Sequence, residues 1–165
     1  MKRFFKTLLY TIFIALLLVQ LYPRPKKNVS TEAGSNDIAA VHQVSADVME
    51  VLKTSCYDCH SNNTVYPWYS TIQPVAMFMG NHVDEGKREL NFSEFGRYSV
   101  RRKYHKLEEI NDQIKEGEMP LSSYTLIHRN AKLNENQKLL VANWAESLRD
   151  SLRKAYPPDS FARRK

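Results

Sequence analysis

Both cysteines of this chain fall within one short stretch, Cys56-Tyr57-Asp58-Cys59-His60. Two thiols three positions apart lie on one turn of backbone, so each can form a thioether with one of two neighbouring vinyl groups on a porphyrin edge. The imidazole of the next residue then points at the iron. This spacing is typical of covalent c-type haem attachment. It predicts one haem c, with Cys56 and Cys59 as its thioethers and His60 as the proximal iron ligand.

Other uses of a cysteine pair have to be weighed against haem. A thioredoxin-type dithiol requires a strand leading into the pair within an α/β pattern, and no such pattern surrounds Cys56. A structural zinc site requires four ligands, usually in two spaced pairs, and the second pair is missing. A disulfide across so short a loop would contribute little stability and would not require His60.

The first 22 residues are basic and then apolar. An apolar run over residues 7–22 follows Lys2, Arg3 and Lys6. A helix over residues 4–22 would be about 28 Å long, which is close to a hydrocarbon core of about 30 Å. The run is not followed by the small residues of a signal-peptidase site. Residues 1–22 are therefore predicted to be an uncleaved transmembrane signal anchor, single-pass in the cytoplasmic membrane, with the haem domain on the periplasmic side.

The rest of the chain divides by composition. Residues 23–43 contain two prolines and a polar run, which indicates a juxtamembrane linker. Residues 44–156 carry the apolar periodicity of a folded haem-binding domain, and residues 157–165 form a basic tail.

The net charge of +6 does not indicate a nucleic-acid partner once it is located. Residues 1–27 hold six basic and no acidic residues, which leaves 18 basic against 18 acidic residues in the remainder. A neutral domain disfavours nucleic-acid binding. The basic stretch between Arg97 and Lys106 is either a solvated helix face or a docking site for an acidic redox partner.

Helical periodicity begins at residue 44. Val44, Val48 and Leu52 recur at helical spacing, with Ser45 as the N-cap. A second helix is expected from Pro74, at its first position, to Gly86, as its stop.

Two longer helices follow. Apolar residues from Val100 to Ile114 form one stripe, which Gly117 should end. Asn134 and Gln137 form a capping box for the last helix, which Pro157 closes. Because no alternating strand pattern occurs, the predicted fold class is all-α.

Several stretches carry a resemblance to a known family: SCYDCHSNNTVYPWYSTIQPV, HVDEGKRELNFSEF, IKEGEMP and YTLIHRNAKLNENQKLLVANW. Together they resemble the bacterial haem-binding domain family of c-type, membrane-anchored monohaem proteins, over about Val44 to Trp144. The family is similar to class I cytochromes c in its order of helix, attachment motif and late Met-Pro before a C-terminal helix. The resemblance implies a class I-like helical fold around one covalent haem.

The sixth iron ligand stays open at this point. Met119 follows Gly117 on a turn that resembles the axial methionine loop of class I cytochromes c, although a methionine there could also fill a core gap. His82, on an apolar helix face, is the alternative. His128, Met77, Met79 or an open sixth site complete the set.

Two further contacts of the haem are expected. The second ring nitrogen of His60 should donate to a backbone carbonyl, with those near Pro67 and Pro74 as candidates. Trp68 and Tyr69 are possible packing residues for the porphyrin, or else they fill a small core.

The function predicted from these residues is one-electron transfer with a redox partner protein, and not enzymatic turnover. A five-coordinate haem protein that senses a gas or reduces peroxide is the alternative, because an open sixth site would admit a small ligand. A thiol-disulfide oxidoreductase is the third possibility.

Overall fold

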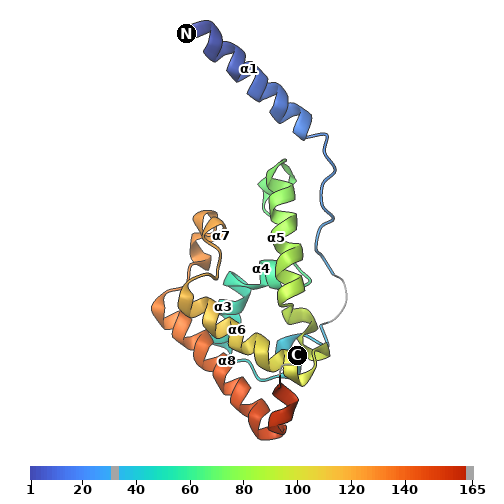
Figure 1. Ribbon diagram of the computed structural model, residues 1–165, viewed down its shortest axis with the longest axis vertical. Helices are drawn as coiled ribbons and strands as arrows, with labels where there is room; N and C mark the ends of the chain where they lie inside the picture. Colours follow the sequence, from blue (N-terminus) through green and yellow to red (C-terminus); the bar gives the residue numbers. More distant parts are fainter. Residues whose placement is uncertain (31–33, 163–165) are drawn as a thin grey trace.

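The computed structural model describes residues 1–30 and 34–162, and helices are the regular elements of that part of the chain (Figure 1). The all-α prediction is therefore confirmed. The α-helices are α1 (Lys2–Val19), α2 (Ile38–Val41), α3 (Ala46–Ser55), α4 (Tyr57–His60), α5 (Val75–Glu89), α6 (Val100–Glu116), α7 (Ser122–Ile127) and α8 (Glu135–Ala155). The 3-10 helices are η1 (Trp68–Thr71), η2 (Phe92–Arg97), η3 (Arg129–Ala131) and η4 (Pro158–Phe161).

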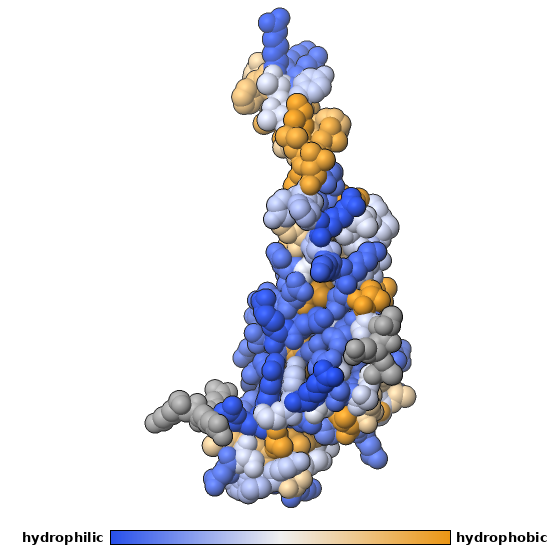
Figure 2. All heavy atoms as spheres, turned by 90° about the vertical axis from the view of Figure 1, so that its right-hand side faces the viewer, coloured by the Kyte–Doolittle hydropathy of each residue, from blue (hydrophilic) through white to orange (hydrophobic). Residues whose placement is uncertain are grey.

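Helix α1 projects from the rest of the molecule and buries none of its residues. The prediction of a transmembrane helix here is wrong, because among the described residues no helix has both the length and the apolar content that a membrane crossing demands. Lys2, Arg3 and Lys6 are the physical reason: the uncharged part of α1 starts only at Thr7 and reaches about 20 Å by Val19, well short of about 30 Å. In Figure 2 the apolar residues of α1 stand above the body, whose visible face is largely hydrophilic.

Part of the predicted linker belongs to the folded domain. The Asn28 side-chain amide donates to the Ser61 carbonyl at 2.8 Å and to Thr64 Oγ1 at 2.9 Å, and the Asn28 N–H donates to the Tyr66 hydroxyl at 2.7 Å. Further along, Ile38 in α2 is fully buried. These contacts fasten the N-terminal segment to the loop that follows His60.

Several helix ends lie where the sequence places them. Ser45 accepts from the Val48 N–H at the start of α3. Gly117 ends α6 with φ 76°, a left-handed conformation that glycine adopts without steric cost. At the start of α8, Asn134 and Gln137 form the predicted capping box.

Gly86 does not end its helix as predicted, because α5 continues to Glu89. The glycine serves packing instead. A Cβ atom at this position would lie 2.7 Å from the Cys59 carbonyl oxygen, so only glycine permits α5 to approach α4 this closely.

The core lies where α6 and α8 pack side by side and α3 crosses α8. Its most deeply buried large apolar side chains come from these helices, from η2 and from α2, and they include Leu52, Phe92, Phe95, Leu107, Val141 and Ile38. This packing fixes the end of α3, from which the chain enters α4.

Candidate functional site

A cavity of about 360 Å³ lies beside the core, between α3, α4, α6 and α8. Its size and mostly apolar walls are typical of small-molecule and cofactor sites. Leu52, Ile110, Leu133 and Val141 are among its apolar residues. We call it the main cavity, and its lining includes Cys56, His60 and Met119.

His60 is held by one backbone contact. Its Nδ1 lies 2.9 Å from the Leu90 carbonyl oxygen. Because a carbonyl oxygen only accepts, Nδ1 carries the proton and the lone pair of Nε2 is free. Burial lowers the pKa of His60, so the ring is neutral at pH 7. A neutral imidazole with a free Nε2 is the form that binds a metal.

The prediction of a backbone carbonyl partner for His60 is confirmed in kind and wrong in position. Leu90, and not a residue near Pro67 or Pro74, supplies the carbonyl. Leu90 is the C-cap of α5, where helix carbonyls lack an intrahelical partner and carry partial negative charge. A hydrogen bond to such an acceptor makes the imidazole a more basic ligand.

The two cysteines are free thiols. Burial raises the pKa of Cys56 to about 12 and that of Cys59 to about 11. At pH 7 a thiol of pKa 11 is ionised in about one molecule in ten thousand, whereas thiol-disulfide exchange needs a ready thiolate.

In the described part of the chain, no group of three or more His, Cys, Asp or Glu side chains is placed to hold a metal ion.

Met119 borders the same cavity as His60, as the late Met-Pro position predicts. Its backbone is fixed by the end of α6, because the N–H groups of Glu118 and Met119 both donate to the Gln113 carbonyl, at 3.0 and 3.2 Å. The structure thus brings together Cys56, His60 and Met119. Ligation by Met119 stays a prediction.

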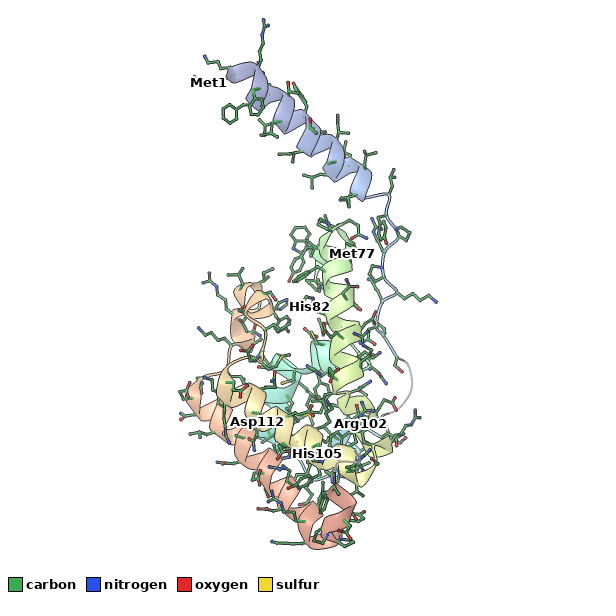
Figure 3. All side chains as sticks on the ribbon, viewed as in Figure 1. Met1, Met77, His82, Arg102, His105 and Asp112 are labelled. Carbon is green, nitrogen blue, oxygen red and sulfur yellow. The ribbon has the colours of Figure 1, made fainter. Side chains whose placement is uncertain are left out.

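His82 lies elsewhere. It lines a second cavity of about 90 Å³ between α5 and α7, and its Nδ1 lies 2.8 Å from the Phe78 carbonyl oxygen (Figure 3). Met79 and His128, two of the other candidate ligands, also line this second cavity, whereas Met77 lines neither of the two cavities.

The two predicted packing aromatics do not line the main cavity either. Trp68 is 79% exposed, and Tyr69 lines the second cavity. Cys59 also contributes to the second cavity, so the cysteine pair joins the two. The aromatic ring that lines the main cavity is Phe92, which the sequence did not single out; its centroid lies 6.4 Å from that of His60.

A charged cluster at the main cavity was also missed. Lys106 Nζ lies 3.2 Å from Glu89 and also pairs with Glu109, and all three residues line the cavity. Lys106 was interpreted as part of a solvated face or of a docking site. Its partner Glu89 lies 17 positions away on another helix, so no local pattern reveals the pair.

These residues fit a covalent haem. Cys56 and Cys59 are free thiols with the spacing of the attachment motif. Nε2 of His60 is free, and Met119, whose side chain carries a thioether sulfur, lines the same cavity as His60. The apolar walls suit a porphyrin face.

Comparison with known proteins supports haem binding. Residues 14–147 match a family described as a haem-binding domain. Searches of curated proteins and of solved structures give no match.

Proposed function

The chain belongs to the haem-binding domain family, and on that premise we propose that it is a monohaem c-type cytochrome that transfers single electrons. In this proposal Cys56 and Cys59 form the thioethers, His60 is the proximal ligand and Met119 is the distal one. The bound group supplies an iron that cycles between the ferrous and ferric states.

The observation that carries the proposal is the meeting of Cys56, His60 and Met119 in one apolar cavity. The His60 ring is fixed by Leu90 and presents a neutral nitrogen. The mostly apolar walls would limit the access of water to a bound iron, and this access is one of the factors that set its reduction potential. Two protein ligands on the iron leave no coordination site for a substrate, so we propose a carrier and not an enzyme.

The proposed compartment lies outside the cytoplasm. The resemblance to c-type cytochromes implies that a Cys-x-x-Cys-His motif is loaded with haem in the export compartment. The proposed partner there is a redox protein.

The test of haem attachment is a pyridine haemochrome spectrum of denatured protein, matured in a host that exports and loads c-type cytochromes. We expect one covalent haem per chain and a matching increase in mass. The matched variant Cys59→Ser, with one thioether fewer, should shift the haemochrome maximum while the chain still carries haem. Colourless protein whose mass equals that of the bare chain would contradict the proposal.

Carbon monoxide distinguishes the carrier from a five-coordinate haem protein. With Met119 on the iron, the ferrous spectrum should be low-spin and should not respond rapidly to the gas. A rapid spectral shift would instead indicate an open site for a diatomic gas or peroxide.

A further inference from the structure

The second cavity lies between α5 and α7, and we call it and its opening the cleft. Asp58 and Cys59 of α4 lie at its base, and Phe78 of α5 and Ile127 of α7 face it from opposite sides. Cys59 lines this cleft, whereas Cys56 lines the main cavity. An edge of any group attached to Cys59 therefore borders this cleft.

Five large apolar side chains on this lining or next to it are between 52% and 79% exposed, and we call them the cleft rim: Val65, Trp68, Phe78, Leu126 and Ile127. Three of them line the second cavity, whereas Trp68 meets the lining residue Tyr69 edge-on and Leu126 precedes Ile127 in α7. Single exposed apolar residues are common on proteins, but several around one hollow mark an interaction surface. Trp is also the residue type most enriched among energetically dominant contacts of interfaces.

The cleft carries little charge. Asp58 is the single carboxylate of its lining, which contains no lysine or arginine. That carboxylate is already bonded, by the Tyr124 hydroxyl at 2.7 Å and by the Val65 N–H at 3.0 Å. A partner face that fits this surface is apolar and weakly charged, in contrast to the acidic face that the basic stretch of α6 would attract.

A series of aromatic contacts joins the base of the cleft to its rim. The Tyr124 ring stacks on His128 with centroids 4.4 Å apart, and His128 Nε2 lies 2.8 Å from the Tyr69 hydroxyl. Tyr69 in turn meets Trp68 edge-on at 5.7 Å. Packed side chains therefore continue from the hydrogen bond on Asp58 to the exposed Trp68.

We propose that a redox partner protein with an apolar, weakly charged face docks on the cleft rim, with Trp68 and Leu126 as its principal contacts. This inference rests on the proposed function. One electron leaves the partner as the ferric iron becomes ferrous, or moves the other way. In that function His60 and Met119 would hold the iron, and Cys59, whose side chain lines this cleft, would carry the part of the haem nearest to the cleft rim.

The experiment uses the full haem-loaded chain and a methyl-terminated alkanethiol monolayer on gold as the apolar partner. Two quantities are measured: the bound mass by surface plasmon resonance, which does not depend on haem, and the interfacial electron-transfer rate by voltammetry. Monolayers ending in carboxylate or ammonium groups provide the charged comparison. Raising the salt concentration should leave the rate on the methyl surface unchanged, because screening acts on charges.

Leu126→Ser and Trp68→Ala should each lower the rate constant on the methyl surface about tenfold, the size expected for losing a principal contact. The visible spectrum and midpoint potential should not change. The matched controls are Leu139→Ser on α8 and Leu9→Ser on α1, which remove leucines that are 60% and 65% exposed. The rate constants of both controls on the methyl surface should stay within about twofold of the parent value, as expected for residues outside the contact.

Equal effects of Leu126→Ser and Leu139→Ser would overturn the inference, as would faster transfer on a charged monolayer. A loss of rate in Leu9→Ser would assign the contact to α1. If sedimentation shows a dimer that Leu126→Ser dissociates, the rim is an interface between copies of the chain and the proposal is wrong. Colourless protein would contradict the proposed function. Haem-loaded variants that keep the parental electron-transfer rate on the methyl surface would contradict only the proposed docking surface.

Discussion

His60 shows which parts of a site a local motif determines. The spacing of Cys56, Cys59 and His60 identifies the donor atoms, because attachment geometry is local. The carbonyl that orients the ring comes from Leu90, 30 positions away, and depends on how α5 packs. The same limit explains why Phe92 and Lys106 were missed, while the apolar face that carries His82 was ambiguous because its neighbour α7 is not visible in the sequence.

Met119 is the proposed distal ligand, and its removal is the most informative test of the site. Met119→Ala should abolish the methionine-to-iron charge-transfer band of the ferric protein, make the ferrous form reactive to carbon monoxide, and lower the midpoint potential, because thioether ligation raises it. The matched variant His82→Ala should change none of these, since His82 lines the other cavity. If the band is lost in His82→Ala and retained in Met119→Ala, then His82 and not Met119 is the distal ligand.

His42 should make stability depend on pH. Burial, followed by the charge of Lys103, lowers the pKa of His42 from 6.5. The unfolded chain therefore binds a proton that the folded chain resists, so stability is greatest above about pH 6.5 and is lost as the pH falls below it. Urea unfolding at pH 7.5 and 5.5 should show a smaller loss in His42→Gln than in the parent. If both proteins lose the same stability between pH 7.5 and 5.5, His42 does not cause the pH dependence.

At the scale of elements, helix starts and stops were predictable where a side chain or a left-handed glycine acts locally. Ser45, Gly117 and the Asn134 capping box all act within one helical turn. Gly86 was misinterpreted as a helix stop because its reason is the Cys59 carbonyl of another helix. A glycine that permits close approach and one that ends a helix look alike in sequence.

Gly86→Ala should therefore destabilise the domain. The added methyl group would lie 2.7 Å from a backbone oxygen that has little freedom to move, so α4 and α5 must separate. We expect a loss of about 1 to 3 kcal/mol of unfolding free energy, as for other overpacked sites. Gly80→Ala is an instructive comparison, because its methyl group would meet the Pro25 ring of the N-terminal segment and not α4. Chemical denaturation of both variants measures the difference.

At the scale of the whole molecule, residues 1–43 were the least predictable. Its apolar run indicates a membrane span by composition, yet three basic residues shorten the uncharged part of α1. The predicted linker over residues 23–43 contains Asn28, whose hydrogen bonds depend on the distant residues Ser61 and Thr64. Composition describes a segment alone, whereas its contacts depend on the rest of the fold.

Truncation tests where the folded domain begins. Replacing residues 1–19 by a cleavable export signal should leave the thermal midpoint of the haem domain unchanged, because α1 buries no residue. Asn28→Ala in the full chain should cost roughly 1 to 3 kcal/mol, since it breaks hydrogen bonds on the loop after His60. Differential scanning calorimetry measures both. A parental midpoint in Asn28→Ala would mean that this segment does not stabilise the domain.

Helix α5 reaches from the cleft rim at Phe78 to its cap at Leu90, a span of about 18 Å. One end of α5 lies at the molecular surface, and the Leu90 carbonyl at its other end orients the imidazole of His60. The proposed docking would therefore place a partner protein on the same helix whose C-cap carbonyl orients the His60 ring.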